Sequence, residues 1–372
     1  MLRSLLSPSL LCLALLLPVS HARADVVRDL YEALIPVQTQ DREERDEAIR
    51  AGLREVLVRV SGQSQLSYEP APAIVAALEQ PTRYTQQFRY RKVNKADRKG
   101  WLQDSQMLLW VKYDERVVNS LLSNAGLPVW GHTRPATLVW LVVAEGGERR
   151  LLSNDEDHPV REELEYAARL RGLPLRFPFN DLTDRGKISV SDIWGNFEEA
   201  ILQASERYRP EAVIVGRLYQ SVAGSWSARW SIYQEGHRQD VDLDGEGLAQ
   251  TIIPVVAAAA EGLAQRFAVV QDASSGGEVR IQIKGVNSLA KYTRVINYLG
   301  SLTAVDRVMP KEVGDDVAVF SLSTESGRQG IAQSINLGHM LVAQQAQPVV
   351  SDPSAPVANP EQQAALVYQL VQ

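Results

Sequence analysis

The side chains of this sequence that could do chemistry are charged residues in short clusters. The strongest basic cluster spans the end of a predicted strand and the polar turn that follows it, and comprises Arg89, Arg91, Lys92, Lys95, Arg98 and Lys99. Cations flanked by Tyr90 and Trp101 attract anionic partners such as lipid head groups, glycan phosphates or acidic proteins. Charges on an exposed hairpin also keep it solvated and prevent edge-to-edge association, which is the commoner role of such a cluster.

Three alternating carboxylates form the weak candidate for a metal site: Asp240, Asp242 and Asp244. They match the first half of a calcium-binding loop, in which alternate carboxylates converge on one ion. The twelfth position of that loop is Thr251 instead of a bidentate glutamate, and Val241 and Leu243 alternate with the aspartates as in a strand. We therefore favour a strand end before a helix and predict no metal.

Motifs for covalent catalysis or cofactor binding lack their partners. Ser288 and Lys291 match the serine–lysine pair of penicillin-binding enzymes, but the companion motifs are absent, so the start of a helix is the simpler explanation. No glycine-rich phosphate loop follows a predicted strand, and Gly146-Gly147 is typical of a hairpin turn. The sequence predicts no cofactor.

One carboxylate set leaves an enzymatic alternative open. Asp181, Asp184 and Asp192 follow the predicted strand 175–179. In open α/β sheets, ligands bind in the crevice outside the carboxyl ends of the strands, so these acids could serve a hydrolase. We favour the reading in which they are loop and helix-capping acids.

The first 24 residues have the layout of a secretory signal peptide. Arg3 supplies a basic start, residues 10–19 are apolar, and Ala22-Arg23-Ala24 is a small-x-small cleavage site before Asp25. The apolar run is too short to span a bilayer. The best later candidate for a membrane span, residues 252–260, is short and interrupted by Pro254. We expect cleavage after Ala24, a periplasmic protein and no transmembrane segment.

Export changes the composition of the chain. The leader holds Arg3, Arg23 and the only cysteine, so its removal leaves 37 of the 39 basic residues against 45 acidic ones, a net charge of −8. A chain without cysteine has no disulfide and no thiolate nucleophile. Export and negative charge both disfavour nucleic acid as a partner.

Hydrophobic periodicity divides the rest of the chain into modules. An α+β module, residues 25–131, is predicted with strands 26–37, 84–93 and 101–113 and helices 42–60, 73–80 and 115–125. An α/β module with a mixed sheet, residues 132–271, is predicted with strands 137–143, 175–179, 212–219, 225–234 and 238–243 and helices 159–171, 193–208 and 247–267. The chain therefore belongs to the α+β and α/β classes.

A third module follows the Ser/Gly-rich linker 272–277. Over residues 276–345 the predicted order is strand 279–283, helix 287–299, strands 303–308 and 317–322, helix 327–337 and strand 339–342, a ferredoxin-like βαββαβ pattern. Residues 346–372 form a Pro-rich tail whose last residues, 361–371, could form a short amphipathic helix.

Five stretches resemble an exported proteobacterial family known only as a domain of unknown function, number two thousand and sixty-six: 56–62, 158–165, 171–175, 191–195 and 213–218. The resemblance covers most of the mature chain and implies export, but the family has no established active site. By element order the first two modules are similar to domains of the flagellar-ring protein FlgT, and the middle module is similar to the amino-terminal domain of TolB.

These observations favour a non-enzymatic periplasmic protein that binds or scaffolds in the cell envelope. Its partner would be another envelope protein or an anionic envelope component, held by the basic cluster. The envelope hydrolase is the alternative.

Overall fold

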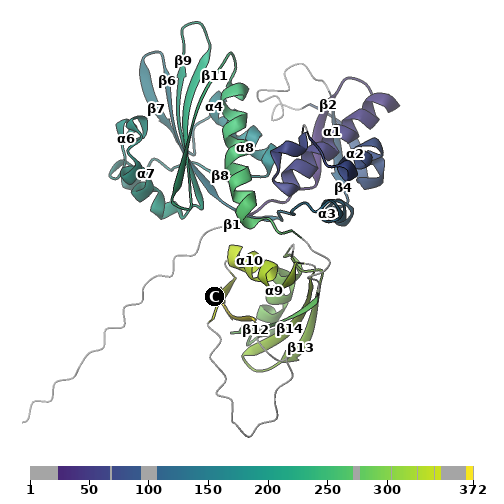
Figure 1. Cartoon of the computed structure of the whole chain (residues 1–372). Helices are drawn as coiled ribbons and strands as arrows, with labels where there is room; N and C mark the ends of the chain where they lie inside the picture. The colour runs from purple at the N-terminus through teal and green to yellow at the C-terminus, as the bar shows by residue number, and fades with distance from the viewer. Residues whose placement is uncertain are drawn as a thin grey trace, which may run out of the picture.

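The computed structural model describes residues 24–67, 69–93, 107–270, 277–302, 304–324, 326–338, 340–344 and 366–371. Helices and sheets are mixed throughout, which confirms the α+β class (Figure 1). We refer to residues 24–131, 132–270 and 277–371 as the first, middle and third domains, and each has its own hydrophobic core. Residues 1–23 of the predicted leader 1–24, residues 272–276 of the linker and residues 346–365 of the Pro-rich tail lie outside the described residues.

The first domain is a three-stranded antiparallel sheet in the order β2-β4-β3, packed against helices. Its elements are β2 (Glu32–Val37), α1 (Arg42–Ser61), η1 (Ser64–Ser67), α2 (Pro72–Glu79), η2 (Pro81–Tyr84), β3 (Thr85–Lys92), β4 (Met107–Tyr113) and α3 (Glu115–Asn124). Helix α1 buries the predicted apolar face, with Ile49, Leu53 and Val56 at most 1% exposed. It ends at Gly62, whose φ of 73° is left-handed and costs glycine little.

The expected strand 26–37 is wrong as a single element, because a turn divides it. β1 (Ala24–Val26) leaves the first sheet and pairs with β5 (Thr133–Pro135). The first strand of the first domain is therefore paired with the first strand of the middle domain.

The middle domain contains a sheet in the order β11-β10-β9-β6-β7, with β8 also paired to β6. The strands are β6 (Thr137–Glu145), β7 (Glu148–Leu152), β8 (Leu175–Arg176), β9 (Ala212–Gln220), β10 (Trp226–Gln234) and β11 (His237–Gly245). β6 runs parallel to β8 and β9, and the other pairs are antiparallel, which confirms the mixed sheet. The hairpin turn at Gly146-Gly147 is confirmed. It leads into β7, which was not predicted because residues 148–150 are polar and show no apolar alternation.

Helices cover both faces of the middle sheet (Figure 1). α4 (Pro159–Arg171) and α8 (Leu248–Phe267) pack on one face, and α6 (Val190–Gly195) and α7 (Glu198–Ser205) pack on the other, next to α5 (Leu182–Arg185) and η3 (Glu206–Tyr208). The expected helix 193–208 is wrong as one piece. Asn196 adopts a left-handed φ of 56° between α6 and α7, which an asparagine tolerates better than most residues.

α8 is long and apolar enough to cross a membrane, as judged from the described residues by length and composition. In the folded protein Ile252, Val255 and Val256 are fully buried against the middle sheet. Trp230 also donates a 2.7 Å hydrogen bond from Nε1 to the carbonyl of Thr251. Packing in a core therefore accounts for the apolar composition of this helix.

The third domain follows the predicted βαββαβ order and adds a strand. Its elements are β12 (Gly277–Lys284), α9 (Leu289–Gly300), β13 (Arg307–Val313), β14 (Val317–Thr324), α10 (Gly327–Leu337), β15 (Leu341–Ala343) and β16 (Leu366–Leu370). β13 begins later than expected. The sheet order is β13-β14-β12-β16-β15, so the added strand separates the first and fourth strands of the pattern.

The terminal helix expected within residues 361–371 is therefore wrong over its described part. Residues 366–370 form β16, which pairs in parallel with β12 and antiparallel with β15. Tyr368 and Leu370, two residues apart, are buried in the third core. Apolar residues at 366, 367, 370 and 371 fit a helix in isolation, but two neighbouring strands satisfy the backbone of an extended segment.

Candidate functional site

The basic cluster of the sequence is only partly within the described structure. Arg89, Arg91 and Lys92 lie on β3, the edge strand of the first sheet, whereas Lys95, Arg98 and Lys99 lie outside the described residues. Lys92 is exposed. Arg89 and Arg91 line a groove of about 300 Å³ between the first and middle domains, which we call the junction groove.

The floor of the junction groove is one face of the first sheet, and its wall belongs to the middle domain. Leu34, Trp110 and Arg89 are cross-strand neighbours on β2, β4 and β3, so their side chains share that face. Tyr166 and Arg169 of α4 line the opposite wall. Residues that are distant in sequence thus present cations and aromatic rings to one space.

Charge in the groove is mixed. The guanidinium of Arg89 lies 4.4 Å from the centre of the Trp110 ring, and Trp110 donates a 2.9 Å hydrogen bond from Nε1 to Glu32. Asp29 and Glu55 also line the groove. Burial raises the pKa of Glu55, and the nearby guanidinium groups only partly oppose this. The groove therefore contains both carboxylates and guanidinium groups, and the guanidinium groups come from β3, α1 and α4.

Three buried arginines hold the two walls of the groove together. Arg134, fully buried, directs all five of its N–H bonds to main-chain carbonyls, those of Arg59, Trp130, Gly131, Arg171 and Gly172. Arg59, on α1, donates from Nε to the main-chain carbonyl of Leu170 in α4 and from Nη1 to the main-chain carbonyl of Glu32 at 2.7 Å. Arg171 donates from Nη2 to the carbonyl of Gly62. These contacts fix α1 against α4, and hence the width of the groove.

We call Arg59, Arg134 and Arg171 the arginine hub. Burial lowers the pKa of each of the three, most strongly for Arg134. Sequence analysis missed the hub as a site, because an isolated arginine in a helix gives no signal of burial. For Arg59 there was one local sign, because it lies within the otherwise apolar stretch 56–60.

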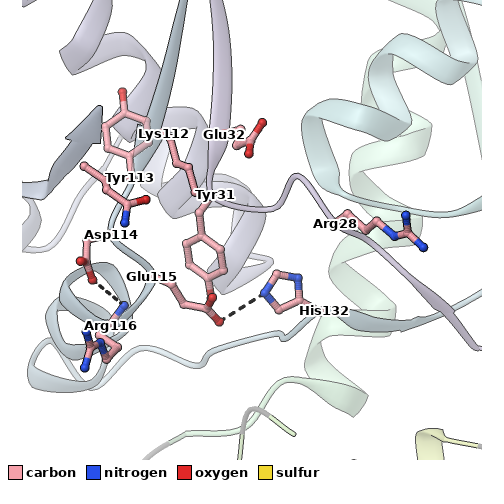
Figure 2. A pocket seen from close by; sticks show the side chains of 10 residues that line it. Arg28, Tyr31, Glu32, Lys112, Tyr113, Asp114, Glu115, Arg116 and His132 are labelled. Atoms are coloured by element: carbon pink, nitrogen blue, oxygen red, sulfur yellow. Dashed lines mark hydrogen bonds and ion pairs between the residues drawn. The ribbon is translucent and has the colours of Figure 1, made fainter. Parts of the chain in front are cut away.

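A second cavity, of about 310 Å³, is lined by residues of the first domain and by His132, which forms a pair with the carboxylate of Glu115 (Figure 2). Nε2 of His132 lies 3.2 Å from Oε1 of Glu115, and Nδ1 lies 2.7 Å from the carbonyl oxygen of Val27. The hydrogen bond to Glu115 is the main reason that the pKa of His132 is raised. Arg28 and Lys112 line the same cavity.

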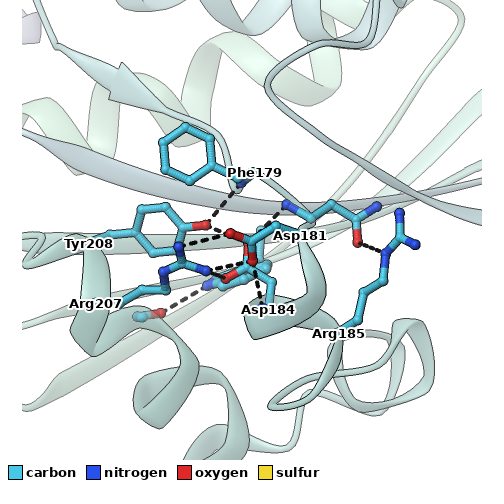
Figure 3. A network of polar contacts seen from close by, with 9 residues as sticks. Phe179, Asp181, Asp184, Arg185, Arg207 and Tyr208 are labelled. Carbon is cyan, nitrogen blue, oxygen red and sulfur yellow. Dashed lines mark hydrogen bonds and ion pairs between the residues drawn. The ribbon is translucent and has the colours of Figure 1, made fainter.

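The carboxylates of the hydrolase alternative have structural roles (Figure 3). Asp184, 1% exposed, accepts hydrogen bonds from Tyr208 at 2.5 Å, Arg207 at 2.8 Å and the Asn180 amide at 2.9 Å. Asp181 caps α5 and accepts two bonds from Arg207, which lowers its pKa to about 2.

Asp192 takes part in a separate capping box with Ser189 at the start of α6. The reading of Asp181 and Asp192 as capping acids is thus confirmed, and the three carboxylates do not converge.

The three candidate calcium ligands stand along the edge strand β11, where Asp240, Asp242 and Asp244 are exposed. Oδ1 of Asp240 accepts hydrogen bonds from Ser231 at 2.6 Å and from Arg238 at 3.0 Å. Alternate residues of a strand are roughly 6.6 Å apart, too far for carboxylates to share one ion without leaving the strand. Among the described residues no group of three or more His, Cys, Asp or Glu could hold a metal.

Ser288 is the N-cap of α9 and accepts a hydrogen bond from the amide of Lys291, which confirms the reading of this pair as the start of a helix. Nζ of Lys291 is 3.0 Å from Asn287.

No curated protein is significantly similar to this chain. Residues 24–131, which supply the floor of the junction groove and Arg59 of the hub, match the model of a family described as a domain of unknown function (DUF8605).

Proposed function

We propose that this protein is exported to the periplasm and acts there as a non-enzymatic binding component of the cell envelope. Its junction groove would take an acidic segment of another envelope protein. The proposal includes kinship with the exported proteobacterial family, number two thousand and sixty-six, and with the FlgT-like and TolB-like envelope domains, which the five resembling stretches and the element order support. The layout of residues 1–24 supports export.

One observation carries the binding role: Arg89 and Arg91 of β3 line the same groove as Arg169 of α4. Guanidinium groups from two domains can each form paired hydrogen bonds with carboxylates. Trp110 and Tyr166 add amphipathic contact area, a composition typical of protein interfaces. The arginine hub holds the two walls at a fixed spacing, which lowers the entropic cost of binding.

Photo-crosslinking in intact cells tests the partner. A photoreactive residue placed at the exposed Lys92 should yield a discrete crosslinked protein. The double variant Arg89→Glu/Arg91→Glu should abolish the adduct. Because Arg91 is half-buried and Arg89 stacks on Trp110, circular dichroism of the variant must show that the first domain is still folded. The matched control is Arg150→Glu/Arg229→Glu, which changes the charge equally at two exposed arginines of the middle sheet.

An adduct with lipopolysaccharide or phospholipid would contradict a protein partner, and an adduct that survives the double variant would contradict the groove. Export is tested separately. The periplasmic fraction should contain a chain whose amino-terminal residue is Asp25, whereas a cytosolic chain that retains Met1 would overturn this part of the proposal.

A further inference from the structure

The middle domain has a cavity of its own, of about 550 Å³, that shares no lining residue with the junction groove. Three of its five lining residues are arginines and the other two are aromatic: Arg176, Arg207, Arg209, Phe179 and Tyr208. Ligand pockets for small molecules usually enclose ~300–1,000 Å³, so this volume suits a small organic ligand. We call it the arginine pocket.

Two of these arginines are fixed from behind by carboxylates that do not line the cavity. Arg176 binds Asp25 with Nη2 at 2.7 Å and Nε at 3.2 Å. Arg207 binds Asp181 and Asp184 through Nη1 and Nη2 (Figure 3). A guanidinium has five N–H donors, so these contacts leave Nη1 of Arg176 and Nε of Arg207 available while holding both groups in place.

Arg209 differs from the other two arginines. Its side chain makes no hydrogen bond or ion pair with any residue in the described part of the chain. Its backbone has a φ of 48°, in the left-handed region that favours glycine. An arginine therefore occupies a position where its own backbone is strained, and strain of this kind tends to persist at binding sites. The three carboxylates near the cavity pair with Arg176 and Arg207 and do not line it: Asp25, Asp181 and Asp184. None of them pairs with Arg209, so the positive charge of Arg209 is not neutralised by an ion pair with a described residue.

The aromatic side of the arginine pocket is built by Phe179, which is 59% exposed. Its ring lies 5.7 Å from the ring of Tyr208, and the guanidinium of Arg207 lies 5.8 Å from the Phe179 ring. Asn180, directly after Phe179, also has a left-handed φ of 51°. An exposed ring beside free guanidinium donors offers an apolar face and an anion site within one cavity.

We propose that the arginine pocket binds a small aromatic anion, a carboxylate or a phosphate ester. Arg176 and Arg209 hold the anionic group, and Phe179 contacts the ring. This site is independent of the junction groove and of the proposed partner, so either can fail without the other.

Isothermal titration calorimetry on the full mature chain tests the site with benzoate, phenyl phosphate, inorganic phosphate and neutral benzyl alcohol. Phenyl phosphate or benzoate should bind saturably, more tightly than inorganic phosphate, and benzyl alcohol should not bind. The informative variant is Arg209→Gly. Glycine relieves the left-handed backbone, so the melting temperature should stay constant or rise, while affinity for the aromatic anion should fall at least about tenfold, the range expected for a lost charged hydrogen bond.

Phe179→Ala should weaken phenyl phosphate but leave inorganic phosphate unchanged, which assigns the ring contact. Arg150→Ala, at an exposed arginine outside the pocket, should change neither. The proposal is overturned if none of the anions binds saturably at millimolar concentration, or if Arg209→Gly binds as tightly as the unaltered protein.

Discussion

The guanidinium of Arg134 donates a hydrogen bond from Nη2 to the main-chain carbonyl of Arg59 over 2.8 Å. Both arginines are buried, at 0% and 4% exposed. Arg59 keeps an ion pair with Glu55 at 3.8 Å, whereas all five N–H groups of Arg134 donate to main-chain carbonyls. For Arg134 the partial negative charges of these carbonyls therefore take the place of an anionic partner. This arrangement joins the first domain, the segment that follows it and α4 at one point.

Replacing Arg134 by methionine should be strongly destabilising. It leaves five main-chain carbonyls without a donor in a buried place, and each buried unsatisfied group costs about 1–3 kcal/mol. We expect the free energy of unfolding to fall by at least about 3 kcal/mol in urea denaturation followed by circular dichroism. Arg150→Met at an exposed position is the control. A loss below about 1 kcal/mol would show that water or a rearranged backbone replaces the hub.

Gly172 should tolerate no side chain. A Cβ atom there would lie 2.7 Å from Nη1 of Arg134, and the φ of 60° is left-handed. Gly146 has nearly the same φ, 59°, but nothing lies within 4 Å of its Cβ position. Gly146→Ala should therefore cost about 1 kcal/mol from backbone strain alone, and Gly172→Ala about 2 kcal/mol more from the clash. If thermal denaturation shows the same loss of stability for both variants, the side chain of Arg134 moves aside at little cost and the predicted clash is wrong.

The last strand should be essential to the third domain. Tyr368 is 2% exposed in the core, whereas Gln369 points to the opposite face of the same strand. Tyr368→Ala should cost about 3 kcal/mol, and Gln369→Ala less than about 0.5 kcal/mol. Truncation after residue 365 should raise amide exchange in β12 and β15 while leaving the middle sheet protected, as measured by hydrogen–deuterium exchange. Unchanged exchange in β12 would mean that the domain folds without β16.

The His132–Glu115 pair should stabilise the first domain in acid rather than in base. Because the pKa of His132 is raised on folding, mainly by Glu115, the pair contributes fully below the unfolded pKa of about 6.5 and loses its contribution as the pH rises through the folded pKa. Glu115→Gln should thus lower the free energy of unfolding at pH 5.5 by up to about 1 kcal/mol, with little effect at pH 8.5. If Glu115→Gln lowers the free energy of unfolding more at pH 8.5 than at pH 5.5, the pKa of His132 is not raised by Glu115 and the prediction is wrong.

Local sequence determined most of the elements of this protein. The apolar face of α1, its end at Gly62, the hairpin at Gly146-Gly147 and the N-cap at Ser288 all follow from residues within one or two turns of each other. Such features depend on the spacing of apolar side chains and on the backbone conformation of single residues, and both are set by residues close in sequence. The order βαββαβ of the third domain and the mixed sheet of the middle domain followed from the same patterns.

Two features of this protein were decided only by the tertiary structure: the strand β16 and the burial of the arginine hub. The apolar residues of Leu366–Leu370 fit the spacing of a helix as well as that of a strand. The segment is a strand because its backbone pairs with β12 on one side and β15 on the other. Arg59 and Arg134 stand 75 residues apart and look like ordinary surface cations in the sequence. Whether a guanidinium meets water, a carboxylate or a set of carbonyls depends on which distant segments pack around it. That packing is a property of the whole chain, because burial is settled by long-range contacts and local periodicity does not encode them.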